Sequence, residues 1–264
     1  MQVPKENRYQ ALLEKIFFDR FSQGDEEVVF AREDIEAAAE TLGIRLPKNL
    51  GDVIYSVRYR TALPESILKE QSGGREWGIE GVGRARYAFR LRKVNRIVPN
   101  PALLAIKIPD ATPQVIAANA LSDEQALLAK VRYNRLIDLF LGLTCYSLQN
   151  HLRTTVKSIG QIEIDELYVG LNRKGAQFII PVQAKGGSDR LGIVQTAQDI
   201  QCCAEKFPDL VCRAISTQFI SDDLIALFEL AIDGDDLKVV EERHYLLVSA
   251  NAISGEELRR YANS

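Results

Sequence analysis

The segment from residue 161 to residue 185, QIEIDELYVGLNRKGAQFIIPVQAK, constrains the fold most, because it contains two strand-like runs joined by a turn. Apolar and polar residues alternate in the first run, the letters NRKGA form the turn, and the second run is apolar almost to its end. This pattern predicts a β-hairpin. Gln183 and Lys185 then share one face of the returning strand, since side chains alternate with a period of two.

If the register places Asp165 opposite these two residues, a carboxylate, an amide and an ammonium group converge. Carboxylate, amide and backbone carbonyl oxygens are ligands for Mg²⁺, so Asp165, Gln183 and Ala184 are the expected metal ligands. Lys185 would orient or help to deprotonate an attacking water and offset transition-state charge. The glycine pair that follows leaves room for a phosphate backbone. Metal-assisted phosphodiester hydrolysis requires such a grouping.

The composition excludes several classes of protein. No run approaches the length of about 18 apolar residues that spans a bilayer, and the first ten residues lack the apolar core of a signal peptide. The four cysteines show neither CxxC spacing nor a nearby histidine pair, which favours reduced, buried thiols. We therefore expect a cytoplasmic protein with no membrane partner.

Charge is distributed unevenly along the chain. The net charge is −3, but residues 55–96 alone carry +6, so the remainder carries −9. A basic block in an acidic chain is typical of a surface that binds a polyanion. A solvated charged face with no ligand is the alternative.

The order of elements in the first hundred residues indicates a DNA-binding module. Helical spacing predicts helices over residues 7–21, 32–43 and 49–59, with a short extended piece, GDEEVVF, between the first two. Residues 75–93 alternate as two strands around a glycine turn. Helix, strand, helix, helix and hairpin is the order of a winged helix, a module that also occurs in protein docking.

A winged helix places its third helix in the major groove and its hairpin against phosphates or in the minor groove. Short polar and basic side chains should therefore project from both elements toward double-stranded DNA. The expected contacts are Lys48, Asn49, Ser56, Arg58, Arg60, Arg84 and Arg86.

The proline-rich residues 94–121 predict a connection, and we place the boundary near residue 110, which gives domains 1–110 and 111–264. A helix is expected over residues 122–142, opened by a capping box and closed by Gly142. Another helix is expected over residues 144–156, with Thr144 as its N-cap.

The rest of the chain predicts a helix over residues 191–207 and strands over residues 211–220 and 235–250. A capping box at Ser254 opens a closing helix. Further candidate DNA contacts follow the hairpin and lie on the first of these helices; they are Ser188, Arg190, Gln195 and Gln198.

Over residues 144–220 the chain resembles the PD-(D/E)XK nuclease superfamily, in the Mrr-like branch whose last motif is QxK. The matching residues are Asp165 and the triplet from Gln183 to Lys185, followed by a helix and an apolar strand. The resemblance implies a central mixed sheet flanked by helices, preceded by a winged helix. Many members carry a glutamate on the helix before the aspartate strand, which residues 144–156 lack. Gln149 or the catalytic candidate Glu163 would replace it.

These features favour a Mg²⁺-dependent, site-specific restriction endonuclease that acts as a homodimer, since each chain carries one site. A modification-dependent enzyme of the Mrr type and a repair or junction nuclease are alternatives. No GxxxxGK[ST] motif is present, which argues against an attached motor. Two classes without nuclease activity remain: a winged-helix transcription regulator, and an adaptor in which Lys185 simply pairs with Asp165.

Overall fold

The chain is a mixed α/β protein that comprises two compact units in a computed structural model. Met1–Val94 with Thr155–Gln161 form the first unit, and Asn95–Thr154 with Ile162–Ser264 form the second. The structure describes residues 5–47, 50, 63–72, 74–83, 85–93, 97–119, 123–157, 159–185, 193–233 and 236–263.

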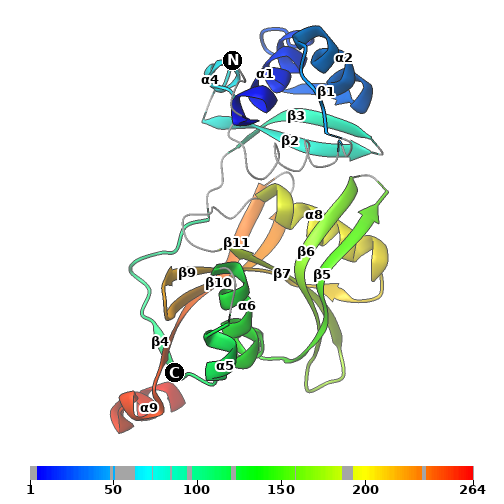
Figure 1. Cartoon of the computed structure of the whole chain (residues 1–264). Coiled ribbons are helices and arrows are strands. Elements are labelled where there is room, and N and C mark those ends of the chain that lie inside the picture. The colour runs from blue at the N-terminus through cyan, green and yellow to red at the C-terminus, as the bar shows by residue number, and fades with distance from the viewer. Residues whose placement is uncertain are drawn as a thin grey trace. The chain divides into compact units, whose positions relative to one another are not determined.

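In the first unit, helices cover one face of a three-stranded antiparallel sheet of order β1-β3-β2 (Figure 1). The elements are α1 (Lys5–Phe18), β1 (Glu27–Ala31), α2 (Arg32–Leu42), α4 (Glu65–Lys69), β2 (Arg75–Gly83) and β3 (Arg86–Lys93). Phe17 of α1 lies edge-on to Trp77 and Phe89 of the sheet, with ring centroids 5.1 Å apart in each pair. Apolar residues of the helices and the sheet thus form one core.

Sequence periodicity predicted these elements well. The helices expected at 7–21 and 32–43 and the hairpin expected at 75–93 are all confirmed. Gly43 ends α2 in the left-handed conformation, with a φ of 63°. The helix predicted for residues 49–59 lies outside the described residues except for Leu50, which is buried in the core.

The second unit is built on an eight-stranded curled sheet of order β4-β11-β10-β9-β7-β6-β5, with β8 beside β7 (Figure 1). Its strands are β4 (Ile106–Pro109), β5 (Thr144–Val156), β6 (Gly160–Leu171), β7 (Gln177–Lys185), β8 (Val211–Cys212), β9 (Ala214–Ser221), β10 (Leu224–Asp233) and β11 (Asp236–Val248). The sheet is mixed, because β4 runs parallel to β11 and β7 runs parallel to both β8 and β9, whereas β6 and β7 are antiparallel.

Helices cover both faces of this sheet (Figure 1). The helices of this unit are α5 (Gln114–Ala117), α6 (Asp123–Tyr133), α7 (Leu136–Leu141), α8 (Ile193–Lys206) and α9 (Gly255–Ala262), with a short 3-10 turn at Ala250–Ala252. Of these, α9 lies beyond the end of the sheet, next to β4 (Figure 1). Alternate residues of β7 face opposite sides of the sheet and pack against different helices. Ile180 and Val182 pack in one core with Leu127 of α6, whereas Ile179 packs with Cys203 of α8.

The helix predicted for residues 144–156 is wrong, because this segment is the edge strand β5. Pairing with β6 satisfies the backbone groups on one side of β5, and the β-branched run Thr154 to Val156 fits a pleated surface. Thr144 is therefore no helix cap. The candidate Gln149 lies exposed on this strand rather than on a helix.

Two further predictions need correction. The single helix expected over 122–142 is broken into α6 and α7 at Arg135, whose φ of 52° is left-handed, although Gly142 closes α7 as expected. The connection expected over 94–121 contains β4, which pairs with β11. The later predictions are confirmed: α8, β8 with β9, β11, and α9 with its Ser254 capping box.

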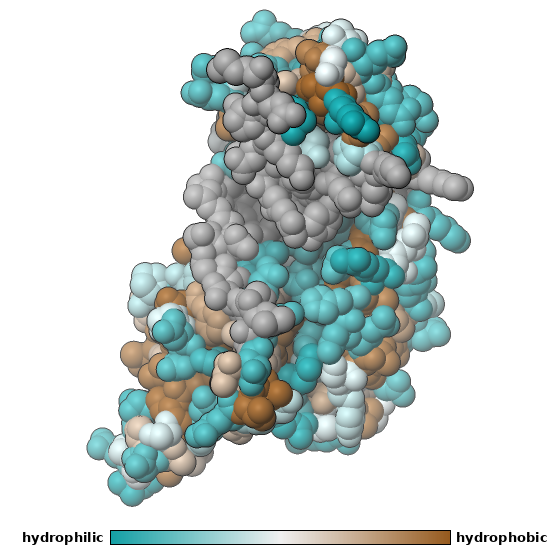
Figure 2. Space-filling view, viewed as in Figure 1, coloured by the Kyte–Doolittle hydropathy of each residue, from teal (hydrophilic) through white to brown (hydrophobic). Residues whose placement is uncertain are grey.

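The visible surface carries apolar residues in separate patches among hydrophilic ones (Figure 2). Large apolar side chains that remain exposed include Leu104 before β4, Val115 in α5 and Leu258 in α9. Scattered apolar side chains are ordinary on a protein surface. We assign no binding role to them.

Candidate active site

The hairpin β6–β7 brings Asp165 and Gln183 together, as the sequence pattern predicted. The strand ladder pairs Glu166 with Val182, so Asp165 and Gln183 are the next residues along each strand and their side chains share a face. The backbone N–H of Ala184 donates a hydrogen bond of 2.9 Å to Oδ2 of Asp165. The carboxylate of Asp165 is thereby fixed against the end of β7.

The surroundings of Asp165 disfavour its charged form. Burial raises the pKa of the Asp165 carboxyl above its usual value, while the Ala184 N–H and the positive charge of Lys185 act in the opposite direction. The negative charge of Glu124 raises the pKa further. A cation beside Asp165 would stabilise its charged form against both the desolvation cost of burial and the repulsion from Glu124.

Glu124 is a candidate residue that the sequence analysis missed. It lies in the first turn of α6, and its Oε1 is 3.9 Å from Nζ of Lys185. Residues 144–156, where the resemblance implies a helix with a carboxylate, form a strand, whereas α6 is one of two helices that pack on β7. The capping signal that predicted this helix already placed Glu124 at its start.

Gln183 is enclosed between the sheet and α8, with 2% of its surface exposed. Its Nε2 donates to Oδ2 of Asp199 at 2.5 Å and weakly to the backbone carbonyl of Glu163 at 3.4 Å. Its Oε1 is buried and has no hydrogen-bond partner among the described residues. Buried acceptors are rarely left unpaired in folded proteins, which makes this oxygen a candidate to bind an ordered water or an ion.

Asp199 on α8 is the second residue that the sequence analysis missed. Only 1% of it is exposed, and burial raises the pKa of its carboxyl well above the usual value, against the effect of the Gln183 hydrogen bond. Asp199 is three residues from Thr196 and four from Cys203, and all three are buried. The sequence signal that could have identified Asp199 was a carboxylate on the apolar face of a predicted helix.

Glu163 does not join Asp165 in the way the sequence analysis expected. Its carboxylate is 3.1 Å from Nε of Arg153 and 3.7 Å from Nδ1 of His151, both on β5. Only its backbone carbonyl reaches Gln183. These contacts hold the Glu163 side chain toward β5.

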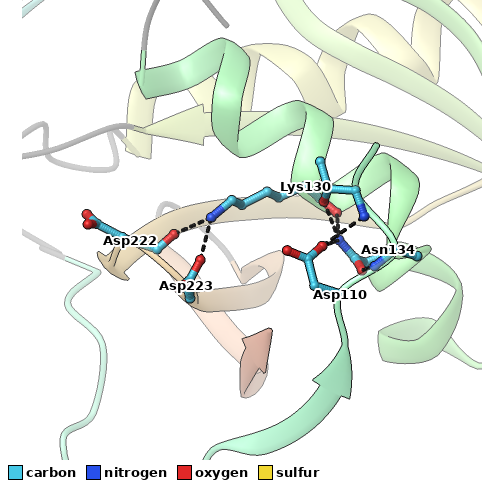
Figure 3. Close-up of polar contacts among 7 residues, drawn as sticks. Asp110, Lys130, Asn134, Asp222 and Asp223 are labelled. Carbon is cyan, nitrogen blue, oxygen red and sulfur yellow. Dashed lines mark hydrogen bonds and ion pairs between the residues drawn. The ribbon is translucent and has the colours of Figure 1, made fainter. Parts of the chain in front are cut away.

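On the opposite face of the hairpin, a second polar cluster holds α6 against the sheet. Glu166 is fully buried and binds Arg132 of α6 through one oxygen and the hydroxyl of Tyr168 through the other. Asn134, just after the end of α6, binds the segment that follows β4 (Figure 3). These contacts fix α6, and Glu124 with it, relative to β6.

The residues at this position fit a magnesium ion. Mg²⁺ keeps several waters and is usually bound through one or two carboxylates together with substrate phosphates. No group of three or more His, Cys, Asp or Glu side chains suited to a metal occurs in the described part of the chain. Asp165 with Glu124 and the unpartnered oxygen of Gln183 match the sparser set that Mg²⁺ requires.

Most of the expected DNA contacts fall outside the described residues, namely Lys48, Asn49, Ser56, Arg58, Arg60, Arg84, Ser188 and Arg190. Arg86 is exposed at the start of β3, and Gln195 is partly exposed on α8. Gln198 is buried, so it offers little surface to DNA.

Part of the basic block is neutralised within the first unit. Arg90 pairs with Glu27 at 2.6 Å and with Glu80 at 3.1 Å, and Arg92 pairs with Glu80 at 2.8 Å. Burial alone would raise the pKa of Glu80, but its hydrogen bonds and ion pairs with the two arginines leave this pKa lowered. These arginines therefore help to hold the sheet, and they contribute less free charge than the sequence count indicates.

No helix in the described ranges has the length and apolar character needed to cross a membrane. Comparison with known proteins found no matching family model, no matching curated protein and no matching solved structure. Function is therefore inferred from the geometry of this chain's own residues.

Proposed function

We propose that this chain is a magnesium-dependent endonuclease that hydrolyses phosphodiester bonds of double-stranded DNA, with a site-specific, restriction-type activity. The observation that carries the proposal is the grouping of Asp165, Gln183 and Lys185 at the end of one hairpin, beside Glu124. The buried, unpartnered amide oxygen of Gln183 adds to it. An adaptor in which Lys185 pairs with Asp165 explains neither Glu124 nor this oxygen.

Each residue then has a distinct role. Asp165, the amide oxygen of Gln183 and the Ala184 carbonyl would hold the ion, with Glu124 as the second carboxylate. Mg²⁺ bound there would polarise the scissile phosphate and stabilise the charge that develops on it. The ammonium group of Lys185 orients the attacking water and offsets negative charge in the transition state.

The first unit would deliver this site to DNA. Its α1, β1, α2 and the β2–β3 hairpin follow the order of a winged helix, and the exposed Arg86 lies next to the hairpin turn, where a winged helix would contact a phosphate backbone. Each chain carries one candidate site, so we propose that a homodimer cuts both strands.

Plasmid cleavage in Mg²⁺ tests the proposal, with EDTA as the control for metal dependence. Asp165→Asn removes the main anionic ligand, so cleavage should fall at least about a hundredfold at any Mg²⁺ concentration, while DNA binding persists. Asp209→Asn, an exposed change just after α8 and away from the hairpin, is the matched control. Its folded fraction should cut at the wild-type rate.

Two outcomes would contradict the proposal. A wild-type protein that binds DNA and leaves it intact in Mg²⁺ would favour a winged-helix regulator. Near-normal cleavage by Asp165→Asn would mean that the hairpin is not the site. Parallel assays on methylated and unmethylated plasmid separate the restriction-type activity from a modification-dependent enzyme.

A further inference from the structure

The contact between Gln183 and Asp199 links the end of β7 to the buried face of α8. Oδ2 of Asp199 accepts the hydrogen bond from Nε2 of Gln183 at 2.5 Å, and both side chains are almost completely buried. Within the described residues, Oδ1 of Asp199 and Oε1 of Gln183 have no partner. Each of these two side chains therefore uses one polar atom in the contact between them and has a second polar atom without a described partner.

The backbone supports the same assignment of the Gln183 amide, with its nitrogen toward Asp199. The carbonyl oxygen of Glu163 lies 3.4 Å from the same Nε2 atom, and a backbone carbonyl only accepts hydrogen bonds. An amide oxygen in that position would face another acceptor. The nitrogen consequently stays between Asp199 and Glu163, and the oxygen is the free end.

We propose that Asp199 is a positioning residue for the metal site of the proposed nuclease: by accepting from the Gln183 nitrogen, it reserves the Gln183 oxygen for the metal ion. The proposal rests on the proposed function, since the ion belongs to that function. Metal sites commonly contain residues that hydrogen-bond to a metal ligand and fix its orientation. Loss of such a residue typically lowers metal affinity about 10- to 100-fold.

A purely structural role is the competing explanation. Ser216 of β9 is the register partner of Gln183, and its hydroxyl is also buried without a partner in the described part of the chain. A water molecule that bridged these groups would make Gln183 an ordinary core amide. In that case Asp199 would affect stability and leave metal affinity unchanged.

Changing the hydrogen-bond donor and acceptor groups of the pair distinguishes a positioning role from a purely structural one. Asp199→Asn can donate as well as accept a hydrogen bond, so residue 199 no longer requires the nitrogen of Gln183, and the amide is free to turn its nitrogen toward the site. We expect the affinity for Mn²⁺, titrated by calorimetry into the full-length protein with and without DNA, to fall about 10- to 100-fold. Asp209→Asn, an exposed change just after α8, is the matched control and should have no effect.

A second substitution should restore the site. In the double variant Gln183→Glu with Asp199→Asn, the new carboxylate accepts from Asn at position 199 and still offers an oxygen to the metal. Mn²⁺ affinity should return to near the wild-type value and should exceed that of Gln183→Glu alone, which carries the same added carboxylate beside Asp199. A purely structural pair predicts no such difference between these two variants. If Asp199→Asn alone does not fold, the Mn²⁺ affinities of Gln183→Glu and of the double variant are compared instead. Gln183→Glu places two acids next to each other, so it should bind Mn²⁺ more weakly than the double variant.

The outcomes distinguish this proposal from the proposed function. Wild-type Mn²⁺ affinity in Asp199→Asn, or a double variant that binds no better than the weaker single variant, overturns the positioning role and leaves the nuclease intact. A wild-type protein that neither binds Mn²⁺ nor cuts DNA overturns the nuclease itself.

Discussion

Two buried side-chain amides in the second unit differ in how their hydrogen bonds are used. Asn134, 6% exposed, accepts from the Ala111 N–H at 2.7 Å and donates to Asp110, Thr112 and the Lys130 carbonyl (Figure 3). Gln183 uses its nitrogen and leaves its oxygen without a partner among the described residues. A fully paired amide stabilises the fold, whereas an incompletely paired one is expected at a functional site.

The same distinction separates two neighbouring acids on β6. Both oxygens of Glu166 are engaged, one by Arg132 and one by the hydroxyl of Tyr168. Asp165 accepts one hydrogen bond, from the backbone of Ala184, and otherwise interacts with nearby charges. Strand alternation therefore places a structural carboxylate and a candidate catalytic carboxylate on opposite faces of one hairpin.

The comparison predicts the largest effect at Lys185. Its side chain is 18% exposed, and its 3.9 Å contact with Glu124 is long for an ion pair. Lys185→Ala should slow single-turnover cleavage by about two to four orders of magnitude, the range for losing one electrostatic or proton-transfer group. Its melting temperature should hardly change.

Lys130 provides the matched control, because its Nζ is held by the Asp222 carbonyl at 2.6 Å and by Asp223 at 2.7 Å (Figure 3). Lys130→Ala should lower stability and leave the cleavage rate of the folded protein unchanged. If Lys185→Ala instead costs about 3 to 5 kcal/mol of stability and cuts at the wild-type rate, Lys185 is only the buried partner of an acid.

A smaller effect, on stability alone, is expected at Asn134. Asn134→Ala removes all four hydrogen bonds of a buried amide, so the free energy of unfolding should fall by about 2 kcal/mol in a denaturant titration. Asn119→Ala is the control, since this exposed amide makes a single bond to the Val115 carbonyl and should change stability by about 0.5 kcal/mol or less. If Asn134→Ala lost cleavage activity without losing stability, complete hydrogen bonding would not distinguish a structural amide such as Asn134 from a functional one such as Gln183.

The sequence predicted the hairpin because its signals are local. Alternation and the NRKGA turn predict both strands but leave their register open, and the observed register places Asp165 opposite Gln183. Residues 144–156 carry no comparably clear pattern, and their strand conformation comes from pairing with β6 at the sheet edge. A tertiary contact of that kind overrides local propensity.

Glu124 and Asp199 could not be assigned from sequence for a related reason. Each reaches the site from a helix, and only the packing of α6 and α8 on opposite faces of the sheet decides which helical residues meet β7. Their helices were predictable from periodicity and capping. Their proximity to Lys185 and Gln183 depends on topology, which a single sequence does not specify.

The smallest predicted effect applies the same criterion to the arginines of β3. Arg90 is engaged by Glu27 and Glu80, whereas Arg86 is exposed and forms no ion pair with a described residue. Arg86 is therefore available to a phosphate. Arg86→Ala should weaken DNA binding modestly and reduce the slope of log affinity against log salt by about one, the value for one lost phosphate contact.

Arg90→Ala is the matched variant for this last prediction, because it removes a positive charge from the same strand. Glu80 and Glu27 already neutralise Arg90, so its loss should destabilise the first unit and change the salt slope less than the loss of Arg86 does. Binding isotherms at several salt concentrations, measured on variants shown to be folded, decide the matter. Equal slopes for Arg86→Ala and wild type would exclude Arg86 from the DNA interface. A larger change for Arg90→Ala than for Arg86→Ala would mean that ion pairing within the protein does not remove an arginine from DNA binding.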